Sequence, residues 1–157
     1  MTVDAAALAA RFAALTLPKD EWTHAAHLTV GAWHVDRHGP VEALTLLRDG
    51  IRRLNESHGN VNTATNGYHE TITAAYVTLL AAYLAACAPG LPLDARVERL
   101  LAGPLAGRDM LLTFYSRERL MSTDARARWV EPDLGPLRIE AVLGVGSYGS
   151  SDPPGEA

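Results

Sequence analysis

The chain has 157 residues, with 14 basic and 18 acidic side chains and a formal net charge of −4. This length suits one domain with a core of its own, and the mild negative charge argues against a nucleic-acid partner. The single cysteine, Cys87, excludes a disulfide within the chain.

The first fourteen residues are rich in alanine but include Asp4 and Arg11. They lack the basic start and the uninterrupted apolar stretch of a signal peptide. The longest apolar run, residues 74–89, is broken by Thr78 and is short for a membrane span. We therefore expect a cytoplasmic protein with no membrane partner.

Hydrophobic residues recur at helical spacing along most of the chain, as in the stripe of Leu44, Leu47, Ile51 and Leu54. Proline and glycine residues punctuate this pattern, above all at Gly39-Pro40. Ser122 is a candidate cap for a short helix. The pattern predicts helices over residues 5–15, 18–38, 41–56, 68–88, 94–101, 109–115 and 124–129.

Residues 57–67 are polar and rich in turn formers, which predicts a loop. Beyond the helices, Pro132 and Pro136 predict an extended carboxyl-terminal strap across the bundle. Residues 144–157 are mostly Gly, Ser, Asp and Pro, a composition typical of a disordered tail. The predicted fold is all-α, a compact single-domain helical bundle over residues 1–143.

Two histidine clusters are the most informative chemical feature. Residues 22–28 read Trp-Thr-His-Ala-Ala-His-Leu, and residues 67–71 read Gly-Tyr-His-Glu-Thr. His24 and His27 lie one helical turn apart, with about 5–6 Å between their Cβ atoms. Two imidazoles at this spacing can converge on one metal ion, and bundles build metal sites from side chains of facing helices.

The second cluster would complete such a site, with His69 as the third ligand. Adjacent helical residues diverge by about 100°, so Glu70 is expected to act as general base or as a partner of a ligand. The predicted cofactor is a divalent ion, Zn, Fe, Mn, Ni or Cu. Zinc would favour hydrolysis of a small-molecule substrate, whereas iron, manganese or copper would permit oxidative chemistry.

Two other interpretations fit the same residues. In the first, the histidines and Tyr68 line a metal-free pocket for a small acidic or polar ligand. In the second, the histidines are core groups of an interaction protein and are satisfied by hydrogen bonds.

Trp22 and Trp33 are expected to anchor the core. The apolar helix faces would also permit a homodimer.

A third segment, residues 114–120 followed by Arg126 and Arg128, is rich in arginine. Guanidinium groups bind carboxylates and phosphates in a bidentate manner. A solvated face with arginine–glutamate pairs explains the same residues, and this reading is favoured.

Three segments, together with residues 50–55 (Gly-Ile-Arg-Arg-Leu-Asn), resemble an uncharacterised family of small bacterial helical proteins. They are the first cluster, residues 67–73 (Gly-Tyr-His-Glu-Thr-Ile-Thr) and residues 129–134 (Trp-Val-Glu-Pro-Asp-Leu). The resemblance implies one module and no particular activity. The chain is also loosely similar in architecture to metal-binding bundles of the DinB type, which hold one ion with three histidines. The histidine spacing here departs from that pattern.

Overall fold

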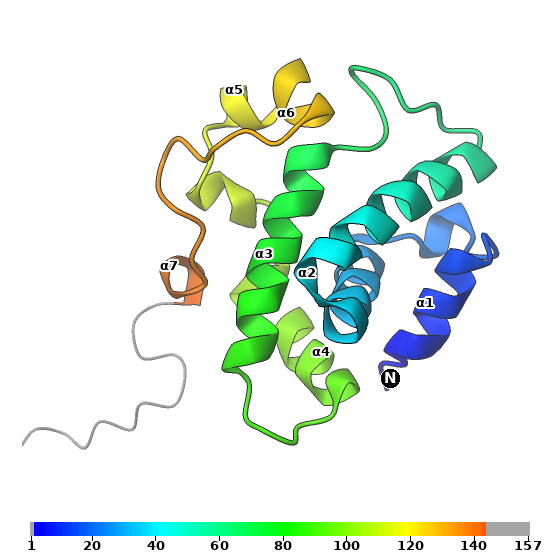
Figure 1. Cartoon of the computed structure of the whole chain (residues 1–157), viewed down its shortest axis with the longest axis vertical. Helices are drawn as coiled ribbons and strands as arrows, with labels where there is room; N and C mark the ends of the chain where they lie inside the picture. Colours follow the sequence, from blue (N-terminus) through cyan, green and yellow to red (C-terminus); the bar gives the residue numbers. More distant parts are fainter. Residues whose placement is uncertain (1, 144–157) are drawn as a thin grey trace, which may run out of the picture.

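A computed structural model describes residues 2–143, and this part of the chain is helical without any strand. The predicted disordered tail, residues 144–157, lies outside the described residues. Figure 1 shows the helices gathered into one compact unit, with α3 between α2 on one side and the carboxyl-terminal segment on the other. The all-α prediction is confirmed. The helices are α1 (Ala5–Ala13), α2 (His24–Ser57), α3 (Glu70–Ala86), α4 (Leu93–Ala102), α5 (Arg117–Leu120), α6 (Thr123–Ala127) and α7 (Glu140–Leu143).

The predicted start of the second helix, at residue 18, is wrong. Pro18 does not open the second helix but precedes a short 3₁₀ helix, Lys19–Glu21. The helix α2 begins only at His24, because the Thr23 hydroxyl accepts a hydrogen bond from the Ala26 amide at 3.2 Å and caps the helix. The first histidine therefore occupies the first position of α2, where its ring can face a neighbouring helix.

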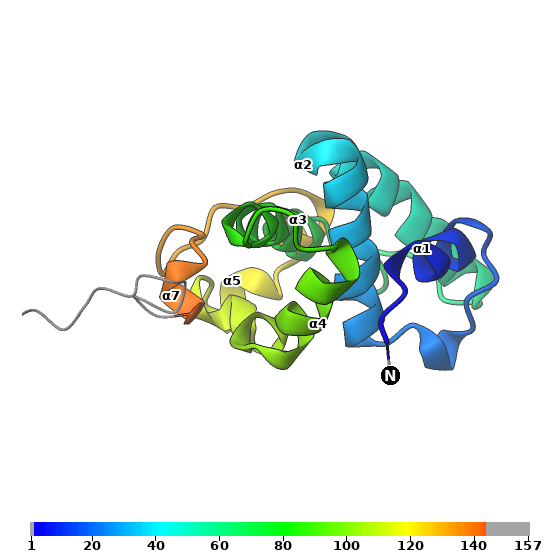
Figure 2. The ribbon, with the colours of Figure 1, turned by 90° about the horizontal axis from the view of Figure 1, so that it is seen from below.

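The predicted break at Gly39-Pro40 is confirmed as a kink inside α2. Gly39 has φ 77° and ψ 165°, which is outside the helical region and is available to glycine without strain. Pro40 follows and cannot donate a backbone hydrogen bond. Figure 2 shows the two halves of α2 running in clearly different directions.

The helix α3 is shorter than the predicted helix of residues 68–88, because it begins at Glu70 and ends at Ala86. It packs against α2 and α6. Its buried residues point to several sides of the helix, as its nearly uniform apolar sequence predicts. They are Thr71, Ala75, Val77, Leu79, Leu80, Tyr83 and Leu84.

After α4, the chain forms two 3₁₀ helices, Pro104–Ala106 and Met110–Thr113. The second replaces the predicted helix of residues 109–115. The Ser122 hydroxyl accepts a hydrogen bond from the Ala125 amide, so the predicted cap of α6 is confirmed.

The predicted carboxyl-terminal strap is confirmed in residues 129–138, which run along the bundle without helix. The Tyr115 hydroxyl donates to the Val130 carbonyl at 2.7 Å, and the Leu134 amide donates to the Phe114 carbonyl at 2.9 Å. Within the described residues, no helix is long and apolar enough to span a membrane.

Candidate functional site

His69 is the amino-terminal cap of α3 and not a residue within the helix. Its Nδ1 accepts a hydrogen bond from the Ile72 amide at 3.1 Å, and its Nε2 lies 2.8 Å from the Leu120 carbonyl oxygen. A nitrogen that accepts is unprotonated and a nitrogen that faces a carbonyl donates, so these contacts define a neutral ring with the proton on Nε2. Both ring nitrogens are therefore engaged by the backbone.

Glu70 lies next to His69 but faces a different set of groups. Its carboxylate accepts hydrogen bonds from Arg48 on α2, with Nε at 3.0 and 3.1 Å, and from the Tyr68 hydroxyl at 2.6 Å. Burial alone would raise the pKa of Glu70, but the hydrogen bonds from Arg48 and Tyr68 and the charge of Arg48 outweigh burial and lower it. The carboxylate is thus an ionised partner in a half-buried ion pair.

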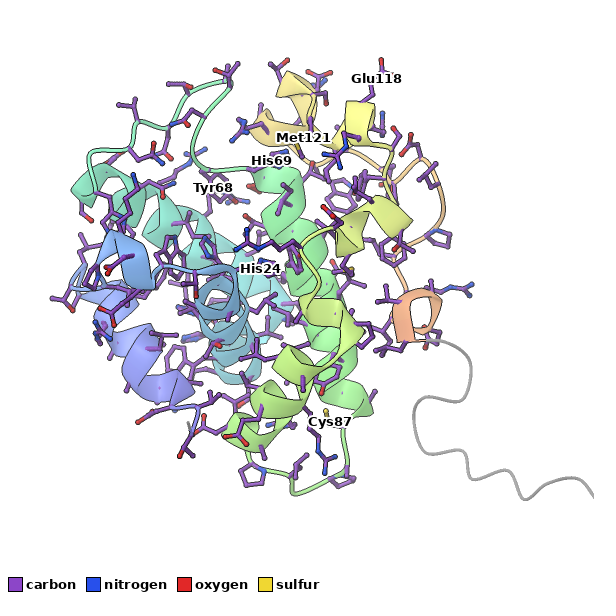
Figure 3. The ribbon with its side chains drawn as sticks, turned by 180° about the vertical axis from the view of Figure 1, so that it is seen from behind. His24, Tyr68, His69, Cys87, Glu118 and Met121 are labelled. Carbon is purple, nitrogen blue, oxygen red and sulfur yellow. The ribbon has the colours of Figure 1, made fainter. Side chains whose placement is uncertain are left out.

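His24 and His27 lie together on the first turn of α2, as predicted, but His69 does not join them. Figure 3 shows His69 at the start of α3, whereas His24, on α2, lies beside a later part of α3. The His24 ring instead meets the Tyr76 ring edge-on, with centroids 5.9 Å apart. Among residues 2–143, no group of three or more His, Cys, Asp or Glu side chains is placed to hold a metal ion.

The two histidines of α2 line a cavity of about 400 Å³ between α2 and α3. Its wall is predominantly apolar, and Gly31 on that wall packs closely against α3, because a Cβ added there would lie 3.0 Å from the Leu80 Cδ1 atom. The lining residues are Trp22, Thr23, His24, His27, Leu28, Gly31, Leu47, Ile51, Ile72, Thr73, Tyr76, Val77, Leu80 and Arg108.

Two side-chain nitrogens among these lining residues are buried without a hydrogen-bond partner in the described part of the chain. They are the indole Nε1 of Trp22 and the Nε2 of His24. Most buried polar side-chain atoms have a partner, and these two exceptions both belong to residues that line the cavity. Trp22 was expected to anchor the core, and its ring stacks on that of Phe12 with 5.3 Å between the ring centroids. The same residue also lines the cavity.

The charge states of the two histidines follow from their surroundings. Burial lowers the pKa of His24, and the positive charge of Arg108 lowers it further, while the Ala106 carbonyl opposes both. Burial also lowers the pKa of His27. Its ring stacks on that of Trp22 with 3.8 Å between the ring centroids, and another part of the side chain is open to solvent. Both imidazoles are accordingly neutral at pH 7.

Arg108 lines the cavity although no sequence pattern indicated it. It lies between the two 3₁₀ helices, far from α2 in sequence, and its side chain is exposed. Within residues 2–143 it has no hydrogen bond or ion pair with another side chain, and the interaction that involves it is with His24. Its neighbour Gly107 indicates a turn and not a binding residue.

The arginine-rich segment is mostly structural. Arg119 donates to the Glu131 carbonyl at 2.6 Å, Arg126 donates to the Gly67 carbonyl at 2.7 Å, and Arg128 pairs with Asp124 at 3.3 Å. These contacts attach the segment to the strap and to the loop before α3. One arginine–acid pair agrees with the favoured prediction of a solvated face, whereas Arg119 and Arg126 bind backbone carbonyls.

Comparison with known proteins finds no matching family model, no matching curated protein and no matching solved structure. The resemblance of the sequence segments to a bacterial family therefore stays a prediction. The proposed function therefore rests on the residues that line the cavity.

Proposed function

We propose that this protein binds a small, largely apolar molecule that carries one polar group, in the cavity between α2 and α3. The observation that carries the proposal is the predominantly apolar cavity itself, whose lining includes Trp22 and His24, two residues that each hold a buried nitrogen without a partner in the described part of the chain. A volume of about 400 Å³ is in the range of small-molecule sites.

Two contributions to the binding free energy support a ligand with an apolar body and one polar group. A buried polar group without a hydrogen bond costs about 1–3 kcal/mol, so a ligand that supplies a partner to either nitrogen gains that amount. Transfer of apolar ligand surface into the cavity contributes roughly 25 cal/mol per Å². Both contributions favour a molecule with an apolar body and a single polar end.

The metal-centred hypothesis remains a separate proposal, with His24 and His27 as its two candidate ligands. Its third predicted ligand, His69, would have to leave the Ile72 amide and the Leu120 carbonyl. Elemental analysis of the purified, untagged protein and of a His24→Ala variant separates the two ideas. Near-stoichiometric metal that is lost in the variant would favour the metal site over the metal-free pocket.

Titration calorimetry with 1-octanol and with benzyl alcohol tests the proposed pocket with one linear and one aromatic probe. Gly31→Val adds bulk to the cavity wall, where its side chain would press on Leu80, and Gly31→Ala is the smaller change should the first variant not fold. Ala25→Val adds a similar side chain to an exposed position of the same helix and is the control.

We expect one molecule of at least one probe to bind per chain. Filling the cavity at Gly31 should weaken this binding about tenfold or more, because a clash of this size costs about 1–3 kcal/mol, and the Ala25 control should leave it unchanged. Binding of neither probe, or equal binding to the natural protein and both Gly31 variants, would contradict the proposal.

A further inference from the structure

A second, smaller cavity of about 240 Å³ adjoins the first. The two share four lining residues, His24, Ile72, Tyr76 and Arg108, so they meet at this boundary. The first cavity extends from it along the apolar faces of α2 and α3. The second extends toward α5, where Leu120 and Met121 line it, and Figure 3 places Met121 near the start of α3.

Three polar groups gather at the shared boundary. The His24 Nε2 is buried without a partner. Neither the Tyr76 hydroxyl nor the Arg108 guanidinium has a hydrogen bond to any other residue in the range 2–143. Burial, and the charge of Asp109, raise the pKa of Tyr76 to about 12, so its hydroxyl keeps its proton and can donate.

The charges around this boundary favour an anion. Among the described residues, no acidic side chain lines the first cavity, and Arg108 is the one permanently charged residue of its lining. Asp109 lines the second cavity and opposes an anion there, but Arg117 lines the same cavity and offsets it. Arg108 would repel an amine or another cation.

We infer that the ligand is a monocarboxylate with an apolar body, bound with its carboxylate at the boundary of the two cavities and its body in the first cavity. The inference rests on the proposed function and names the ligand class of the same site. Arg108 supplies the charge and a bidentate fork, and the Tyr76 hydroxyl supplies a further hydrogen bond.

Calorimetric titrations with octanoate and 1-octanol, which share the same chain length, test the inference at fixed ionic strength. Arg108→Gln removes the charge from an exposed side chain, and Arg53→Gln makes the same change at another exposed position outside both cavities. Tyr76→Phe removes only the hydroxyl group. Circular dichroism of each variant establishes that it is folded.

We expect octanoate to bind the natural protein about tenfold more tightly than 1-octanol, as a charge-assisted contact implies. Arg108→Gln should remove this preference, Tyr76→Phe should reduce it, and Arg53→Gln should leave it intact. Equal binding of octanoate and 1-octanol, or a preference that survives Arg108→Gln, would overturn the carboxylate inference and leave the proposed pocket standing. If octanoate binds the natural protein no more tightly than it binds the Gly31→Val variant, both the carboxylate inference and the proposed pocket are overturned.

Discussion

The imidazole Nε2 of His69 lies 2.8 Å from the carbonyl oxygen of Leu120 and joins the start of α3 to the end of α5. The other ring nitrogen accepts the Ile72 amide, so one side chain both caps a helix and ties two distant segments together. This arrangement accounts for a histidine in an apolar region without any ligand, and it leads to the first two predictions.

Replacement of His69 should cost stability in a graded way. Asn is a good helix cap but cannot be expected to reach the Leu120 carbonyl, so His69→Asn should lose about 1 kcal/mol. His69→Ala loses the cap as well and should lose about 2–3 kcal/mol. Chemical denaturation measures both values. Equal losses in the two variants would show that the ring does not cap α3.

Protonation of His69 should destabilise the fold as the pH falls. Burial lowers the pKa of His69 below the ordinary value of 6.5, and the charge of Arg126 adds to this effect, against the Leu120 carbonyl. Between the lowered pKa and 6.5 the unfolded chain binds more protons than the folded chain, so the stability present above pH 6.5 declines below it.

The lowered pKa values of His24, His27 and His34 act in the same direction. The free energy of unfolding, measured by denaturation from pH 7.5 to 5, should therefore decline in the natural protein. It should decline less steeply in His69→Asn. Identical slopes for the two proteins would exclude a folded-state role for the neutral His69 ring.

The ion pair between Glu70 and Arg48 should be structural. The Glu70 side chain is 12 % exposed and that of Arg48 is 34 % exposed. Glu70→Gln leaves the guanidinium without its charged partner and should cost about 1–3 kcal/mol. Glu42→Gln, at an exposed carboxylate that faces His38 at 3.7 Å, is the control and should change stability by about 0.5 kcal/mol or less. Loss of ligand affinity without loss of stability would instead favour a functional Glu70.

Thr71 should hold the strap on the bundle. Its fully buried hydroxyl donates to the Arg128 carbonyl at 2.8 Å and accepts from the Val130 amide at 3.1 Å. Thr71→Val keeps the shape but leaves both backbone groups unpaired, so it should cost about 2 kcal/mol. Thr78→Val, at an exposed hydroxyl on the same helix, serves as the control. Hydrogen exchange at the Val130 amide should accelerate in Thr71→Val and not in the control.

Local sequence patterns predicted the helices well because their causes are local. The apolar stripe of residues 44–54, the stop at Gly39-Pro40 and the Ser122 cap each depend on neighbours within a few positions. The end of α3 near Ala86 likewise follows from Pro89 and Gly90. Two errors lie at boundaries where a single side chain decides, at Thr23 and His69, and one concerns the type of helix, since residues 110–113 form a 3₁₀ helix.

The candidate site could be predicted only in part. The spacing of His24 and His27 brought them correctly to one face, and both line the cavity. His69 was expected to join them because helices of a bundle face one another, but the point at which α2 crosses α3 depends on the kink at Gly39 and on tertiary packing. Arg108 reaches the cavity from a segment with no periodic pattern, so no local signal could place it there.

The most direct test of the cavity as a ligand site is the indole N–H resonance of Trp22 during a titration with octanoate, followed by ¹H–¹⁵N NMR. Trp22→Phe assigns the signal, and Trp129, whose indole donates to Glu131 at 3.0 Å, provides an internal control. We expect the Trp22 signal to shift with saturation while the Trp129 signal stays in place. An unmoved Trp22 signal, or shifts of both signals that grow without saturation, would contradict a specific site in the cavity.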